Sequence, residues 1–194
     1  SNPALTVTGN TASGSGIALA PMMVRVNASR TKITNDTNLE SVFNTANRAL
    51  TLAANTLYYF RGAYRITTSA TTSSAVPQIG FIFSNAQQTI SYKYSSFVVL
   101  GYPSTTSPVL SNYASVATAQ SLSTTGLTSA TAYYVEFEGW FKSNATTGGT
   151  VIPAFTQTAV GTSVPPTVGS DSWIMVQPMS SNINAQIISG TWGS

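Results

Sequence analysis

Two segments of two-residue alternation constrain this fold more than any other feature of the sequence. Residues 57–66 read LYYFRGAYRI, and residues 132–142 read AYYVEFEGWFK. In each segment, one set of alternate positions is mainly aromatic or aliphatic, whereas the other set carries the charged side chains. Successive side chains of a β-strand point to opposite faces, so the pattern predicts two strands that each bury one face.

Shorter segments of similar character extend this prediction along the chain. Further strands are expected at 23–26, 78–83, 89–94, 97–100, 150–158, 172–179 and 187–192, with a tight turn at 144–149. Many short strands with turn residues between them are typical of a sandwich or a jelly roll. We therefore predict an all-β fold, an antiparallel and jelly-roll-like β-sandwich of about eight to ten strands.

Three segments give less regular signals. Pro153 predicts that its strand lies at a sheet edge or a bulge, because proline has no N–H to donate to a neighbouring strand. Residues 35–48 match a capping box at Thr37 and Glu40 and allow one or two helical turns. Residues 101–130 are rich in Ser, Thr and Pro and predict a long exposed loop, with one strand near 114–119.

The first twenty residues differ from the rest of the chain. They carry no charge and are rich in small residues, which predicts an extended N-terminal arm at 1–20 followed by the sandwich domain at 21–194. A disordered leader is the alternative. An arm that docks on a neighbour would use its apolar residues as anchors. These candidate contacts with a shell or a subunit are Leu5, Val7, Ile17 and Leu19.

The chain has very few charged or catalytic side chains. Only 7% of its residues are charged, and it has no histidine and no cysteine. Typical domains are roughly 25% charged, and a surface with few charges is poorly protected against association. The lack of histidine removes the commonest general base and metal ligand. We therefore expect a non-enzymatic protein without metal or cofactor, whose surface is largely covered by neighbouring subunits.

The dispersed basic residues give no support to nucleic-acid binding, since no basic run occurs. No apolar run approaches the roughly 18 residues that a membrane-spanning helix needs. We therefore expect neither a nucleic-acid partner nor membrane insertion.

Four charged residues in the two alternating segments have two interpretations, a catalytic carboxylate pair or cross-strand ion pairs. Glu136 and Glu138 share one strand face at a spacing of roughly 6.7 Å, within the range of paired glycosidase carboxylates. Arg61 and Arg65 likewise share one face of the other segment, four residues apart. If the two strands pair, cross-strand ion pairs account for all four residues, and we favour that interpretation over catalysis.

Tyr134 and Trp140 are aromatic residues on the same strand face as the two glutamates. Exposed aromatic side chains anchor protein interfaces or stack on sugar rings, and a covering layer would make them part of a core. We favour a subunit interface and keep glycan binding and core packing as alternatives.

Several segments resemble a β-rich domain of tailed-bacteriophage structural proteins. They are LTLAANTLYYFRGAYRI (50–66), ATAYYVEFEGWFKSNATTGGTVIPAFTQT (130–158), DSWIMVQPM (171–179) and GTWGS (190–194). The resemblance covers roughly residues 49–194 as a pattern of spaced aromatics and turns. It implies a homotrimeric jelly roll on the virion surface, either a capsid decoration or fibre that contacts the major capsid protein, or a tail-fibre module that binds a receptor or host glycan. The pattern contains no catalytic residues.

Overall fold

The computed structural model describes residues 21–44, 48–67, 76–85, 89–99, 106–123, 132–160 and 165–180. Within these ranges the chain forms thirteen strands and no helix. The strands are β1 (Met22–Arg25), β2 (Arg30–Thr31), β3 (Glu40–Ser41), β4 (Leu50–Leu52), β5 (Leu57–Thr67), β6 (Pro77–Phe83), β7 (Thr89–Val99), β8 (Thr106–Ala114), β9 (Gln120–Ser121), β10 (Ala132–Lys142), β11 (Gly149–Gln157), β12 (Thr167–Val168) and β13 (Trp173–Ser180). The arm at 1–20 and the expected strand at 187–192 lie outside the described residues.

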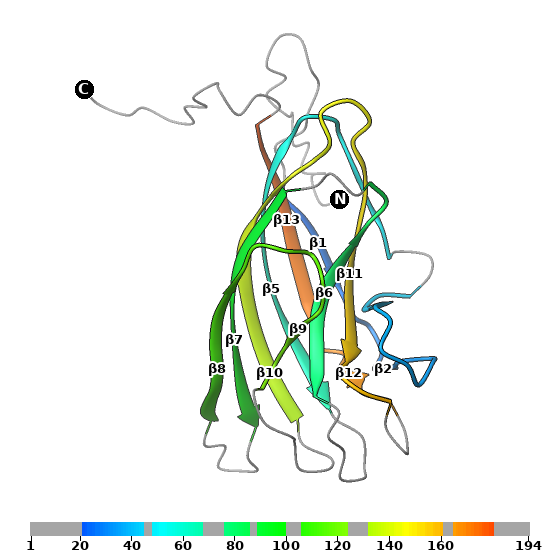
Figure 1. The fold of residues 1–194 in the computed structure, drawn as a ribbon, viewed down its shortest axis with the longest axis vertical. Helices are drawn as coiled ribbons and strands as arrows, with labels where there is room; N and C mark the ends of the chain where they lie inside the picture. Colours follow the sequence, from blue (N-terminus) through cyan, green and yellow to red (C-terminus); the bar gives the residue numbers. More distant parts are fainter. Residues whose placement is uncertain are drawn as a thin grey trace, which may run out of the picture.

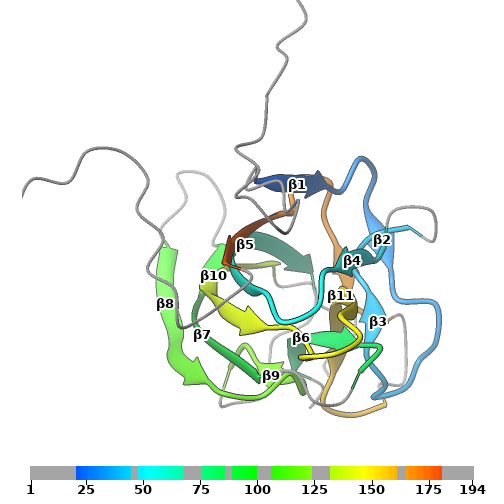
Figure 2. The same ribbon diagram turned by 90° about the horizontal axis from the view of Figure 1, so that it is seen from above.

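The strands form two antiparallel sheets that face each other (Figures 1 and 2). The larger sheet has the order β1-β13-β5-β10-β7-β8, with β2 and β12 beside it, and the smaller has the order β3-β11-β6-β9, with β4 on β11. This confirms the all-β sandwich. Five strands are only two or three residues long, and the eight longer ones agree with the predicted number.

Seven of the eleven strand pairings among the described residues are nested along the chain. They are β1 with β13, β2 with β12, β3 and β4 with β11, β5 with β10, β6 with β9, and β7 with β8. The chain therefore behaves as one long hairpin, with its tip between β7 and β8, that is rolled into two layers. This is the arrangement of a jelly roll, as predicted.

The alternating faces of β5 and β10 form the centre of the core. Phe60 is fully buried, and its ring lies 5.0 Å from that of Phe81 on the smaller sheet. The rings of Tyr64 and Phe137 pack edge to face with centroids 4.7 Å apart. A Cβ atom at Gly62 would lie 2.5 Å from the Phe137 ring, so this glycine makes room for the aromatic side chain on the next strand.

The predicted tight turn at 144–149 is confirmed. Asn144 and Gly148 form a bridge, and Gly148 has a φ of 61°, in the left-handed region that favours glycine. The Asn144 side-chain oxygen accepts hydrogen bonds from the backbone N–H groups of Thr146 and Thr147. The turn thereby connects β10 of the larger sheet to β11 of the smaller sheet.

Three local predictions were wrong. Residues 35–44 contain no helix, because Glu40 lies in β3, and its carboxylate accepts hydrogen bonds from Arg30 and from the backbone N–H of Ile33 instead of capping a helix. The expected exposed loop at 101–130 contains β8 and β9, whereas residues 115–119 form no strand. The sequence of β8, TSPVLSNYA, lacks the alternation that would distinguish it from a loop.

Pro153 lies in an interior strand, not at an edge. β11 pairs with β6 on one side and with β4 and β3 on the other. The β4 pairing ends at Val151 and the β3 pairing begins at Ala154, so Pro153 lies at the interruption between them. The missing N–H therefore costs no ladder hydrogen bond there, while the Pro153 carbonyl still accepts one from the N–H of Val42.

The outer face of the smaller sheet is covered by the chain itself. Ala154 and Thr156 have side chains on this face, and both are fully buried. A Cβ atom at Gly80 would lie 3.0 Å from the Ala117 carbonyl oxygen and 3.1 Å from a Leu39 methyl carbon. Leu39 and residues 117–119 therefore form a covering layer over Gly80 on this face.

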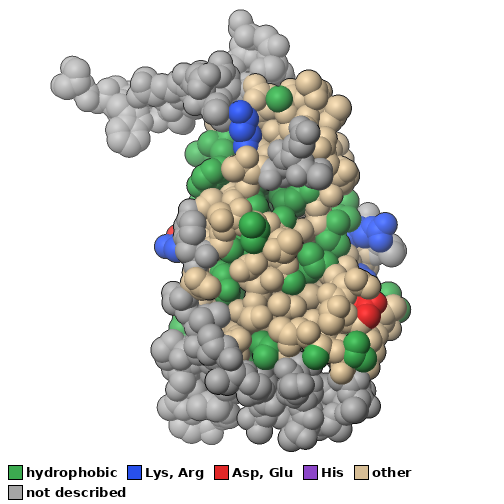
Figure 3. All heavy atoms as spheres, in the orientation of Figure 1, with side chains coloured by type: hydrophobic (Ala, Val, Ile, Leu, Met, Phe, Trp, Pro, Cys, Tyr) green, Lys and Arg blue, Asp and Glu red, His purple; other side chains and the backbone are tan. Residues whose placement is uncertain are grey.

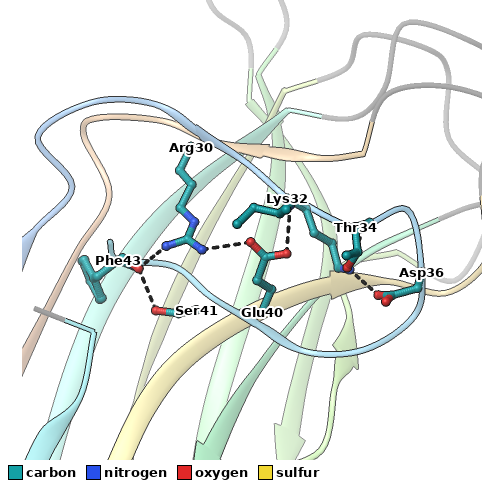
Figure 4. A network of polar contacts seen from close by, with 8 residues as sticks. Arg30, Lys32, Thr34, Asp36, Glu40, Ser41 and Phe43 are labelled. Carbon is teal, nitrogen blue, oxygen red and sulfur yellow. Dashed lines mark hydrogen bonds and ion pairs between the residues drawn. The ribbon is translucent and has the colours of Figure 1, made fainter. Parts of the chain in front are cut away.

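A network of charged groups, which we call the clasp, holds the segment 30–43, which contains Leu39 of the covering layer (Figure 4). Arg30 forms an ion pair with Glu40 at 2.9 Å and also donates to the Phe43 carbonyl. The Lys32 side chain is fully buried and donates to Asp36 and to the Thr34 carbonyl. Burial of a charge is costly unless it is paired, so these contacts fix the path of the segment.

Candidate functional site

Among the described residues, no segment covers the outer face of the larger sheet in this way, and this face carries most of the predicted site residues. β10 pairs with β5 on one side and β7 on the other, in a register that sets Glu138 opposite both Arg61 and Lys93. Lys93 Nζ lies 2.6 Å from Glu138 Oε1, and the Tyr59 hydroxyl donates to Oε2 at 3.2 Å. The ion pair of Glu138 is therefore with Lys93, which sequence reasoning did not select because the position of β7 was unknown.

Arg61 makes a different contact. Its guanidinium lies over the indole ring of Trp173, 5.6 Å from the centroid, which is a cation–π geometry. Ala63 on β5 lies between Trp173 on β13 and Glu136 on β10, and Ser95 on β7 lies opposite Glu136. Small side chains between larger ones leave a depression of about 460 Å³, with Trp173, Arg61, Lys93 and the two glutamates around it.

Glu138 lacks the property that a general acid of a glycosidase pair needs. The hydrogen-bonded Lys93 ammonium lowers the pKa of the Glu138 carboxyl below its ordinary value. A general acid needs a raised pKa, so that it still holds a proton at neutral pH. The three ion pairs of the described residues include neither Glu136 nor Arg65. Among these residues, no group of three or more acids could hold a metal ion.

Tyr134 and Trp140 lie on the expected outer face but not together. Six residues along a strand separate them by roughly 20 Å. Tyr134 is opposite Arg65 and Phe97, whereas Trp140 is opposite Tyr59 and Ser91. Burial raises the pKa of Tyr134, and nearby Glu136 and Asp171 add to the rise. Trp140 has 42% of its surface exposed.

A surface that sequence reasoning missed lies toward the β1 edge of this sheet. The chain has four methionines, and all of them are on β1 or β13. Met23 lies opposite Met175, and both share the outer face with Trp140; Met23 is 64% exposed and Met179 is 44% exposed. We call Met23, Met175, Met179, Tyr59 and Trp140 the methionine–tryptophan face. The sequence alone does not show that these methionines lie together, because that depends on the pairing of β1 with β13.

Charged side chains are sparse on the opposite side of the molecule. Figure 3 shows the face that carries β6 and β11, where hydrophobic and uncharged polar groups dominate and charged atoms form a few isolated spots. The described residues contain no helix that is long and apolar enough to cross a membrane. The arm residues Leu5, Val7, Ile17 and Leu19 lie outside the described part of the chain.

Comparison with known proteins adds no assignment. No family model, curated protein or solved structure matches this chain. The resemblance to phage structural proteins therefore stays a prediction.

Proposed function

We propose that this protein is a non-enzymatic structural protein of a bacteriophage, which decorates or projects from the capsid surface as a homotrimer. The observation that carries the proposal is the exposed methionine–tryptophan face on a chain of which only 7% is charged. Large apolar side chains exposed on one sheet face favour an interaction site, and methionine adapts well to a partner surface. The spacing of aromatics and turns at 49–194 supports the phage assignment.

The assembly part of the proposal is tested by the oligomeric state of the full chain. We expect sedimentation equilibrium to give a trimer, and Met23→Ser combined with Trp140→Ser to shift the population strongly toward monomer. Glu136→Gln on the same face, outside the methionine–tryptophan face, serves as the matched control and should leave the trimer intact. A wild-type chain that stays monomeric at micromolar concentration would contradict this part.

The virion part needs a separate test. An antibody against the chain should label the outside of purified phage particles from the source of this sequence, and mass spectrometry should find the chain in many copies per particle. Imaging of the particle would then place it against the major capsid protein or at the tail. Particles without the chain would refute the virion role but leave the self-association result unaffected.

A second candidate, glycan binding by a tail-fibre module, is favoured by the depression at Ala63 and Ser95. Its 460 Å³ volume falls within the range of small-molecule sites, and it combines an indole with carboxylates and cations. An indole face stacks on sugar rings, and carboxylates accept hydrogen bonds from sugar hydroxyls. A glycan array should give hits that Trp173→Ala and Glu136→Gln both abolish and Trp140→Ser preserves. Hits that survive both changes would exclude this site.

A further inference from the structure

An apolar groove opens between one edge of each sheet. β1 pairs only with β13 and β4 only with β11 among the described residues, so each has a free edge. Met22 and Met23 form one wall of the groove, and Ala49 and Leu50 form the other. Core side chains such as Phe81 and Phe141 lie at its floor. The groove therefore leads from the surface directly to the hydrophobic core.

The size and chemistry of the groove select its occupant. The cavity is about 120 Å³, well below the roughly 300 Å³ at which small-molecule sites begin. A cavity of this size lined by aliphatic and aromatic side chains stays dry and accepts a small apolar group. Its lining contains one charged residue, Arg48, and no acid. The fitting occupant is one or two aliphatic side chains rather than a cofactor or a polar peptide.

The chain itself supplies such side chains close in sequence to the groove wall. Residues 1–20 are uncharged and end two residues before Met22, which forms part of the groove wall. Ile17 precedes Met22 by only five residues, an extended span of at most roughly 18 Å. The short connection keeps the entropic cost of docking low. The second apolar patch of the arm, around Leu5 and Val7, is much farther along the chain.

We propose that the N-terminal arm of the same chain docks in this groove through Ile17 and Leu19. The short connection described above favours this arm over that of a neighbouring copy. The inference does not depend on a virion role, because it follows from the groove and from the sequence beside it.

The lack of cysteine allows a direct test in the full chain. In the double variant Ile17→Cys/Ala49→Cys, a disulfide can form only if the two Cα atoms come within about 7 Å. Thr118 is exposed like Ala49 but lies over the outer face of the smaller sheet, so Ile17→Cys/Thr118→Cys is the matched control. We expect the first pair to cross-link at least ten-fold faster under mild oxidation.

A non-reducing gel separates the two sources of the arm. A compact cross-linked monomer identifies the arm of the same chain, and a covalent dimer or larger ladder identifies that of a neighbour. A compact monomer that forms only with Ala49→Cys supports the proposal, whereas a covalent dimer as the main product would overturn docking by the arm of the same chain. Equal rates for the two pairs, or no cross-link in either, would overturn the proposal.

A second measurement separates docking from mere proximity. Ile17→Asp combined with Leu19→Asp would place charge in the apolar groove, so we expect the Tm of the full chain to fall by about 4 °C or more. Leu5→Asp combined with Val7→Asp adds the same charge to the same arm and should leave the Tm within about 1 °C. Equal shifts in both variants would show that the groove does not select Ile17 and Leu19.

Discussion

The outer faces of the two sheets differ sharply. On the smaller sheet, Ala154 and Thr156 are fully buried, and Leu39 and residues 117–119 of the same chain lie over the neighbouring Gly80. On the larger sheet, the equivalent face leaves Trp140, Met23 and Met179 between 42% and 64% exposed. The inner faces of both sheets pack into the same core, so the difference concerns only what lies outside the sandwich.

The difference separates the surface that serves folding from the surface available for binding. Small side chains and the clasp keep the covering layer close to β6 and β11, so substitutions there should act on stability. The outer face of the larger sheet has long and polarisable side chains that no described segment covers, so substitutions there should act on association. The predictions below test this separation from the largest expected effect to the smallest.

The largest effect is expected under the covering layer. Ala154→Leu adds three carbon atoms to a fully buried position, and overpacking of this kind costs about 1–3 kcal/mol in the free energy of unfolding. Ser95→Leu makes a similar enlargement beside the open depression and should change the free energy of unfolding by less than about 0.5 kcal/mol. Urea denaturation of both variants as monomers measures the contrast. Similar losses would show that the larger sheet is also covered.

The clasp should give the next largest effect. Glu40→Gln keeps the shape of the side chain but weakens the ion pair with Arg30, for an expected loss of about 1–2 kcal/mol. Glu136→Gln is the same chemical change at an exposed position without an ion pair to the described residues, and it should cost less than about 0.5 kcal/mol. Equal costs would mean that the clasp does not hold the covering layer.

Sequence reasoning predicted the inner faces well and the outer faces poorly, for a physical reason. The alternation in 57–66 and 132–142 reports burial on one side of a strand, and both inner faces follow it. What covers the other side depends on segments distant in sequence. The segments around Leu39 and residues 117–119 carry no periodicity, since their path is fixed by contacts such as Arg30 with Glu40 and by their fit over Gly80.

For the candidate site too, the sequence predicted which residues share a strand face but not which residues of distant strands lie beside them. Period-2 spacing placed Glu136, Glu138 and Trp140 on one face, and the structure keeps them there. The partner of Glu138 could not be predicted, because it required the position of β7 beside β10. The methionine–tryptophan face required the pairing of β1 with β13, which joins residues about 150 positions apart and leaves no local signal in the sequence.

Acid should affect the two outer faces differently. Lys32 lowers the pKa of Asp36 well below its ordinary value, and Lys93 lowers that of Glu138. A carboxyl with a depressed folded-state pKa adds stability that is fully present above its unfolded pKa, about 3.9 for Asp, and is lost as the pH falls toward the folded value. Asp36→Asn should therefore remove part of the acid-induced loss of stability below about pH 4.

Salt separates the two contributions. The Lys93–Glu138 pair is exposed, so 1 M NaCl should largely abolish its effect, whereas the side chain of Lys32 is fully buried and its pair with Asp36 should be less sensitive. Thermal unfolding of Asp36→Asn and Glu138→Gln from pH 2 to 7, at low and high salt, measures both. An equally strong salt dependence of the two pairs would contradict the distinction between the faces.

Methionine oxidation gives the smallest effect on stability but the most direct view of the open face. In the monomer, dilute hydrogen peroxide should oxidise Met23 and Met179 faster than the half-buried Met175, because susceptibility follows exposure. If copies of the chain associate through the methionine–tryptophan face, the assembled protein should protect Met23 and Met179 severalfold, as peptide mass spectrometry would measure. The monomeric Trp140→Ser/Met23→Ser variant supplies the reference rate for Met179. Oxidation of Met179 at the same rate in the oligomer and in this variant would mean that the subunits associate through another surface, and that this face stays open for a different partner.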